Sequence, residues 1–150
     1  MKLAAALSER ASLQEKIQEL SVRLNSNAKV QEGEQPSEDP EVLLNELEDS
    51  LSRLEELIIR INLTNSLTKV NGMTITEYIA KRDVLKKKIS IYRDFLNSAR
   101  QKVDRYSSKE IRILSTIDVA ETQKKVNAYS GKLRELDDKL QEANWTTELM

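Results

Sequence analysis

The sequence predicts an all-α protein, an elongated antiparallel bundle of long heptad-patterned helices. Apolar residues recur alternately four and three positions apart in four segments, which places each set on one helical face. Hydrophobic residues make up 39% of the chain and charged residues 33%, with only three glycines and two prolines. This composition is typical of solvated helices packed along narrow apolar seams. We expect a single helical domain over residues 1–150, with helices at about 2–25, 40–62, 75–106 and 118–144 and an acidic linker at 30–39.

The first predicted helix, residues 2–25, ends where Asn25, Ser26 and Asn27 offer side chains that compete for backbone hydrogen bonds. The linker that follows contains Gly33 and Pro36, which favour a break in regular structure. The predicted apolar stripe of this helix consists of Leu3, Ala6, Leu13, Ile17, Leu20 and Leu24.

The second predicted helix, residues 40–62, has a strong start signal. Asp39 is a favourable cap, Pro40 suits the first helical position, and Glu41 lies at the positive end of the helix dipole. Additional apolar residues beside the main stripe predict contact with more than one neighbour. The predicted stripe consists of Leu44, Leu47, Leu51, Leu54, Ile58 and Ile61, widened by Leu43, Leu57 and Ile59.

Residues 62–73 are polar and β-branched, so we expect a connection here rather than helix. Asn71-Gly72 favours a type I′ turn, which is compatible with a very short β-hairpin.

The third predicted helix, residues 75–106, carries the longest stripe. Arg82 is its one charged member, and a seam arginine must reach water or an acid, so we interpret it as fixing helix register or oligomeric state. A second row, formed by Val84, Lys88, Ile91 and Phe95, predicts surface for a partner. The main stripe consists of Tyr78, Arg82, Leu85, Ile89, Tyr92, Leu96, Ala99, Val103 and Tyr106.

The fourth predicted helix, residues 118–144, begins at the capping residue Asp118. Trp145 follows it, and we expect this side chain either to dock the C-terminal segment onto the bundle or to contact another subunit. The stripe consists of Val119, Thr122, Val126, Tyr129, Leu133, Leu136, Leu140 and Ala143.

Charge is distributed unevenly along the chain. Residues 31–57 contain ten acids and one base, a net charge of −9, whereas residues 77–112 contain eleven bases and five acids, a net charge of +6. Opposite charges predict that the second and third helices form an antiparallel pair. The whole chain has a net charge of −1 and no recognisable nucleic-acid-binding module, so we expect no nucleic-acid partner.

The composition removes several kinds of chemistry. The chain has no cysteine and no histidine, which excludes thiolate catalysis, disulfides and the usual zinc ligands. The acidic linker lacks the ligand spacing of a calcium loop. We therefore expect no cofactor, no metal and no catalytic residues. The N-terminal apolar run is too short for a signal peptide, and no stretch approaches the about 18 apolar residues of a membrane span, so we expect a cytoplasmic protein without stable membrane insertion.

Several polar signatures occur in order along nearly the whole chain. They are Asn27-Ala28-Lys29-Val30-Gln31-Glu32-Gly33-Glu34, Asp39-Pro40, Arg60-Ile61-Asn62, Thr64-Asn65, Arg82-Asp83-Val84-Leu85, Asp104-Arg105-Tyr106, Ser115-Thr116-Ile117-Asp118-Val119 and Asn144-Trp145-Thr146-Thr147-Glu148-Leu149. In these signatures the chain resembles a family of small bacterial proteins of unknown function labelled septicolysin-like. The resemblance implies no catalytic residues. Its label suggests a cytolysin, although the sequence lacks the strongly amphipathic, apolar segments of a pore former.

Eight signature residues fall near predicted helix ends and the connection after the second helix. We expect them to form a hydrogen-bonded cluster that sets interhelix geometry, with binding of a small polar ligand as the alternative. The candidate cluster consists of Arg60, Asn62, Thr64, Asn65, Arg82, Asp83, Asp104 and Arg105.

The sequence thus predicts a non-enzymatic α-helical structural or interaction protein that forms a homo-oligomer through its apolar stripes. One alternative is a ligand-binding protein or enzyme that uses Arg60, Asn62, Arg82 and Asp83. A third hypothesis is the membrane-active cytolysin that the family label suggests.

Overall fold

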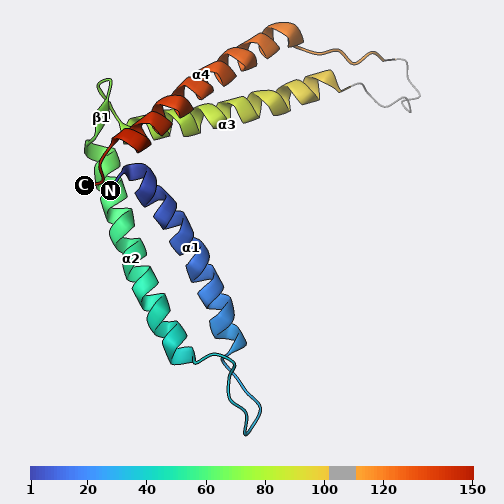
Figure 1. Ribbon diagram of the computed structural model, residues 1–150. Helices are drawn as coiled ribbons and strands as arrows, with labels where there is room; N and C mark the ends of the chain where they lie inside the picture. The colour runs from blue at the N-terminus through green and yellow to red at the C-terminus, as the bar shows by residue number, and fades with distance from the viewer. Residues whose placement is uncertain (102–110) are drawn as a thin grey trace. The chain divides into compact units, whose positions relative to one another are not determined.

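A computed structural model describes residues 1–101 and 111–150. These residues form four α-helices and one two-stranded antiparallel sheet (Figure 1). The predicted all-α class is therefore confirmed. In chain order the elements are α1 (Leu3–Ser26), α2 (Pro40–Leu67), β1 (Lys69–Val70), β2 (Met73–Thr74), α3 (Ile75–Arg100) and α4 (Val119–Thr146).

The described chain divides into two compact units. Unit 1 comprises Met1–Ile75 together with Glu142–Met150, and unit 2 comprises Thr76–Gln141. Unit 1 is therefore built from two separate stretches of sequence, and the last turn of α4 belongs to it. The expectation of a single domain stays a prediction.

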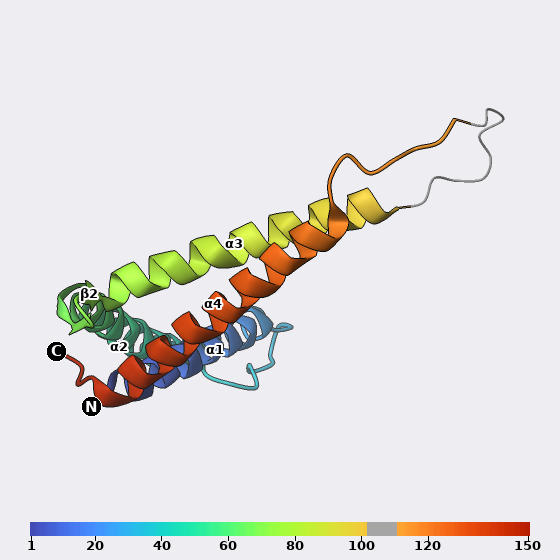
Figure 2. The same ribbon diagram turned by 90° about the horizontal axis from the view of Figure 1, so that it is seen from above.

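In unit 1, α1 and α2 pack side by side and run antiparallel (Figures 1 and 2). Their flanks carry ion pairs that repeat every seven residues. Glu9 pairs with Arg53 at 2.6 Å, and Lys16 pairs with Glu46 at 2.8 Å. Seven residues are about two turns of helix, so the two ion pairs lie on the same side of the α1–α2 interface.

The buried face of α2 includes alternate members of the predicted stripe, Leu47, Leu54 and Ile61, together with the flanking residues Leu43 and Leu57. Leu43, Leu57 and Ile61 are buried, together with two polar residues, Ser50 and Thr64. The hydroxyl groups of these two donate to the carbonyls of Glu46 and Arg60, at 2.7 and 2.8 Å. A hydroxyl satisfied within its own helix can be buried at little cost. Among the predicted stripe residues, Leu44, Leu51 and Ile58 are instead exposed by 47%, 40% and 38%.

Helix α2 also continues beyond the predicted end at residue 62. It ends at Leu67, so Asn62, Thr64 and Asn65 are helical rather than part of a connection. Burial of Ile61 and Thr64 favours continued helix, and Ser66 donates from its hydroxyl to the carbonyl of Asn62 at 2.8 Å. The helix propensity of Asn, Ser and Thr is weak, and prediction from propensity alone therefore placed the end of α2 too early.

The predicted hairpin is present. Lys69 pairs with Thr74 and Val70 pairs with Met73 across the turn. Asn71 and Gly72 have φ angles of 50° and 84°, the left-handed values that a type I′ turn requires at both central positions.

In unit 2, α3 packs against α4 around Ile89, Leu96 and Val126. The predicted stripes are the ones that meet here, and Leu85, Tyr92, Ile117, Val119, Tyr129 and Leu133 surround the buried centre. Asp118 caps α4 by accepting a hydrogen bond from the Glu121 amide at 3.1 Å, as its position predicted. Helix α3 ends at Arg100 rather than at residue 106; the stripe positions Val103 and Tyr106 lie outside the described residues.

The predicted pairing of the second helix with the third would join unit 1 to unit 2, and it stays a prediction. Within unit 1, Glu46 and Arg53 of α2 pair with Lys16 and Glu9 of α1, and within unit 2, α3 packs against α4. Trp145 does not dock the C-terminal segment, because its side chain is 69% exposed.

Candidate functional site

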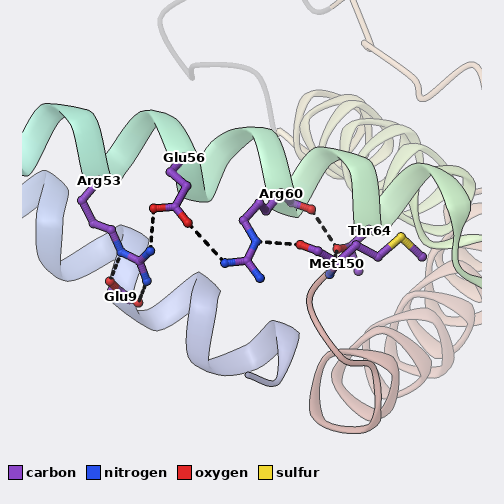
Figure 3. A network of polar contacts seen from close by, with 6 residues as sticks. All are labelled: Glu9, Arg53, Glu56, Arg60, Thr64 and Met150. Carbon is purple, nitrogen blue, oxygen red and sulfur yellow. Dashed lines mark hydrogen bonds and ion pairs between the residues drawn. The ribbon is translucent and has the colours of Figure 1, made fainter.

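A line of polar contacts follows α2 in unit 1 (Figure 3). Arg53 holds Glu9 of α1 with two hydrogen bonds, from Nε at 2.6 Å and from Nη2 at 3.0 Å. Its Nη1 donates to Glu56 at 2.8 Å, and Glu56 also accepts from Arg60 at 3.3 Å. A planar guanidinium that grips a carboxylate with two parallel bonds fixes direction as well as distance. Arg53 therefore aligns α1 on α2.

The line ends in a closed set of contacts around Met150 (Figure 3). Arg60 donates from Nε to the main-chain oxygen of Met150 at 2.6 Å, and the Met150 amide donates to the Thr64 hydroxyl at 3.0 Å. That hydroxyl donates in turn to the Arg60 carbonyl at 2.8 Å. The three residues thus form a closed set of hydrogen bonds, which fixes the C-terminal segment on α2.

The segment before Met150 pairs with the beginning of α1. The Leu3 amide donates to the Thr147 carbonyl at 2.9 Å, and the Leu149 amide donates to the Met1 carbonyl at 2.8 Å. Lys2 pairs with Glu148 at 2.6 Å. Leu3 and Leu149 are buried, so the polar contacts surround an apolar centre.

At the far end of α1, a second group of contacts holds the 27–39 connection. Asn27 donates from Nδ2 to the Arg23 carbonyl at 2.8 Å and accepts from the Glu38 amide at 3.0 Å. Arg23 donates from Nε to Glu38 at 3.0 Å, and Asn27 is buried. This group closes the loop over the end of α1.

The electrostatics of these contacts keep the carboxylates ionised. The hydrogen bond from Arg53 lowers the pKa of Glu9 and that of Glu56. Arg23 likewise lowers the pKa of Glu38, Lys16 that of Glu46, and Lys2 that of Glu148. A general acid or base needs a pKa near neutrality, and these shifts go the other way. The contacts of these carboxylates brace the helices.

The structure brings together only part of the predicted cluster. Arg60 and Thr64 meet at Met150, whereas Asn62 is exposed. Asn65 is half-buried, and its Oδ1 atom has no hydrogen-bond partner in the described part of the chain. Arg82 and Asp83 form an ion pair of 3.0 Å between neighbouring residues on α3, in unit 2. Asp104 and Arg105 lie outside the described residues.

Sequence reasoning missed the residues that make the most extensive contacts. Glu9 and Arg53 are 44 positions apart, and no local signal marks them as partners. Their spacing from Lys16 and Glu46, seven residues in each helix, is the signal that could have found them. Asn27 belongs to a quoted signature, but its bond to the Glu38 amide depends on how the loop folds back.

Unit 2 contains a groove between α3 and α4, with a volume of about 680 Å³. We call it the lysine-rimmed groove. We call the apolar part of its lining its floor, and one acid, Glu135, also lines it; the floor consists of Ala80, Val84, Leu85 and Leu136. Four lysines also line the groove, and we call them its rim: Lys81 and Lys88 from α3 and Lys132 and Lys139 from α4.

Lys88 also contacts the helix interface beside the groove. Its ammonium lies 3.9 Å from the centroid of the Tyr129 ring, a cation–π contact. Tyr92 meets the same ring edge-on, with centroids 5.5 Å apart. The contacts of Lys88 and Tyr92 with Tyr129 lower the pKa of its hydroxyl.

Neither a metal centre nor a membrane span is evident in the described residues. Across residues 1–101 and 111–150, acidic side chains do not gather in groups of three or more that could hold a metal ion. Over the same residues, every helix falls short of the length and apolar character needed to cross a membrane.

Comparison with known proteins places the chain in a family but gives it no activity. A search of curated proteins found no match. A crystal structure from Corynebacterium diphtheriae, described as a functionally unknown conserved protein, is 42% identical, with a TM-score of 0.92 over 100% of this chain and 99% of that one. The model of DUF6847, a family of unknown function, matches residues 10–149. The septicolysin-like resemblance is not tested by these matches and stays a prediction. The chain belongs to the DUF6847 family.

Proposed function

We propose that this protein is a non-enzymatic helical module that associates with copies of itself. The observation that carries the proposal is the exposed stripe on α2, where Leu44, Leu51 and Ile58 repeat every seven residues beside the buried face. A heptad row of large aliphatic residues is the pattern by which helices recognise one another. Left in water, such a row favours association.

A second exposed row on α3 supports the same proposal. Val84, Ile91 and Phe95 are exposed by 69%, 58% and 47%, although they follow the four-three spacing of a seam. Rows on both units give each copy two apolar surfaces, and self-association is the economical way to cover them.

The internal use of the polar cluster favours a structural role over ligand binding. Arg60 and Thr64, the two members brought together in unit 1, are occupied by the main chain of Met150. A ligand at this position would have to displace the C-terminal segment. The enzymatic alternative and the cytolysin alternative stay predictions, and leakage of a dye from liposomes would test the latter.

Light scattering coupled to gel filtration tests the proposal directly. At micromolar concentration we expect a mass that is a multiple of 17.2 kDa and that falls on dilution. A measured mass that stays at 17.2 kDa over the whole concentration range would contradict self-association.

A matched pair of variants makes the measurement specific. Leu44→Glu alters the exposed α2 row and is expected to lower the mass, whereas Val22→Glu alters an exposed apolar residue of α1 and is expected to leave the mass unchanged. Equal effects of the two variants would show that association does not use the α2 row.

A further inference from the structure

We infer that the lysine-rimmed groove of unit 2 receives helix α2 of a second copy of this chain. This inference rests on the proposed function, because it names the two surfaces through which copies would associate. It depends on matching patterns of charge and apolar residues on the two surfaces.

The cations of the groove repeat at a fixed interval. Lys81 and Lys88 are seven residues apart on α3, and Lys132 and Lys139 are seven apart on α4. Seven residues of α-helix rise about 10.5 Å. The groove therefore presents two levels of positive charge about 10.5 Å apart, with an apolar floor between its walls.

The exposed face of α2 has the complementary pattern. Leu44, Glu48, Leu51, Glu55 and Ile58 are spaced four and three residues apart, and all are exposed. The apolar members repeat every seven residues, and so do the two glutamates. If the leucines occupy the floor, Glu48 and Glu55 reach the rim at the same interval of about 10.5 Å as the lysines.

Placing an amphipathic helix in an apolar groove is a common mode of recognition. Because α2 and the groove belong to the same chain, every copy of the protein supplies one of each. Two copies related by a two-fold axis would make the contact twice, with α2 of each in the groove of the other. The net charge of −9 over residues 31–57 would also attract α2 to the lysines during encounter.

Disulfide trapping tests this contact. The chain contains no cysteine, so disulfides can form only between the introduced residues. One preparation carries Leu51→Cys and a second, distinguishable by an affinity tag, carries Val84→Cys. After mixing and mild oxidation, we expect a disulfide between the two different chains. The control replaces Leu51→Cys with Ser12→Cys, an exposed position of α1, and is expected to give little product.

Charge exchange tests the same contact in a reversible form. Glu48→Lys with Glu55→Lys, and separately Lys81→Glu with Lys88→Glu, should each weaken association about tenfold, because attraction becomes repulsion at both levels. Mixing the two variants should restore association between unlike chains, since each then supplies the complement of the other. Circular dichroism checks that both variants remain helical.

The outcomes separate this inference from the proposed function. If the unmodified protein is oligomeric but the Leu51–Val84 disulfide does not form, the groove is not the receiving surface and only this inference fails. Disulfides between two Leu51→Cys chains would instead show a contact between α2 helices. A doubly substituted chain that closes an internal disulfide at monomer mass would place α2 in its own groove and overturn the inference. A monomeric unmodified protein would overturn both.

Discussion

Arg53 of α2 grips Glu9 of α1 with two parallel hydrogen bonds, of 2.6 and 3.0 Å. The same guanidinium reaches Glu56 on its own helix at 2.8 Å, so one cation serves two carboxylates. These contacts make the stability of unit 1 dependent on the ionisation of its glutamates.

We expect unit 1 to lose stability on acidification. The pKa values of Glu9, Glu38 and Glu46 are lowered below the ordinary 4.5 by hydrogen bonds from Arg53, Arg23 and Lys16. Since the folded carboxyls bind protons less readily than the unfolded ones, their stabilisation is complete above pH 4.5 and disappears as pH falls through the lowered values. Urea unfolding between neutral pH and about pH 3 measures this loss.

A neutral variant identifies the contribution of one pair. Glu9→Gln should lower the urea midpoint at neutral pH and should approach the unmodified protein at acidic pH. Glu15→Gln, at an exposed position of the same helix, is the control and should be close to the unmodified protein throughout. A constant difference between Glu9→Gln and the unmodified protein at every pH would contradict the ionic explanation.

Truncation of the buried seam should be far more costly than truncation of the exposed face. Leu20 is fully buried on α1, and Leu20→Ala should destabilise the protein by about 2–5 kcal/mol. Val22→Ala, two residues away and 57% exposed, should change stability by about 0.5 kcal/mol or less. Chemical unfolding of both variants provides the measurement, and similar losses would mean that the helix faces are wrongly assigned.

The Thr64 hydroxyl should contribute measurably because it is fully buried and acts as both donor and acceptor. Thr64→Val leaves the Met150 amide without its acceptor and should cost about 1–3 kcal/mol. Ser66→Ala removes a similar bond to a carbonyl at an exposed position and should be nearly neutral. Hydrogen exchange of the Met150 amide should accelerate in the first variant only; unchanged exchange would show that the amide is protected by other means.

Removal of the Lys88 ammonium should raise the pKa of Tyr129. The contacts of this cation and of Tyr92 hold that pKa below its ordinary value, so Lys88→Met should return it part of the way. Ultraviolet difference titration against Tyr129→Phe isolates the one phenol among four tyrosines. Lys86→Met, at an exposed position nearby, is the control, and an equal rise in both variants would indicate a general charge effect.

Local features of the fold could be predicted because they depend on neighbouring residues. Pro40 at the first position of α2, the Asp118 cap of α4 and the Asn71-Gly72 turn were all identified from short sequences. The stripes of α3 and α4 were correct for the same reason, since their apolar residues coincide with the buried face.

Tertiary choices could not be predicted from the same signals. A heptad stripe shows that a face is buried, but α2 offers two overlapping stripes, and the buried one includes Ser50 and Thr64. Net charge favoured α3 as the partner of α2, whereas Arg53 and Glu46 find their partners on α1. Of the candidate cluster members in unit 1, Arg60 and Thr64 meet through Met150, a residue that carried no polar side-chain signal.

The discontinuity of unit 1 has a consequence for synthesis. Its α1 and α2 helices are made before α3 and α4, but the contacts of Leu3 with Thr147 and of Thr64 with Met150 require residues that follow α4. Domains that are continuous in sequence can fold as they are made. Of these two units, unit 1 begins to be translated first, but it is completed only after α3 and α4 have been made.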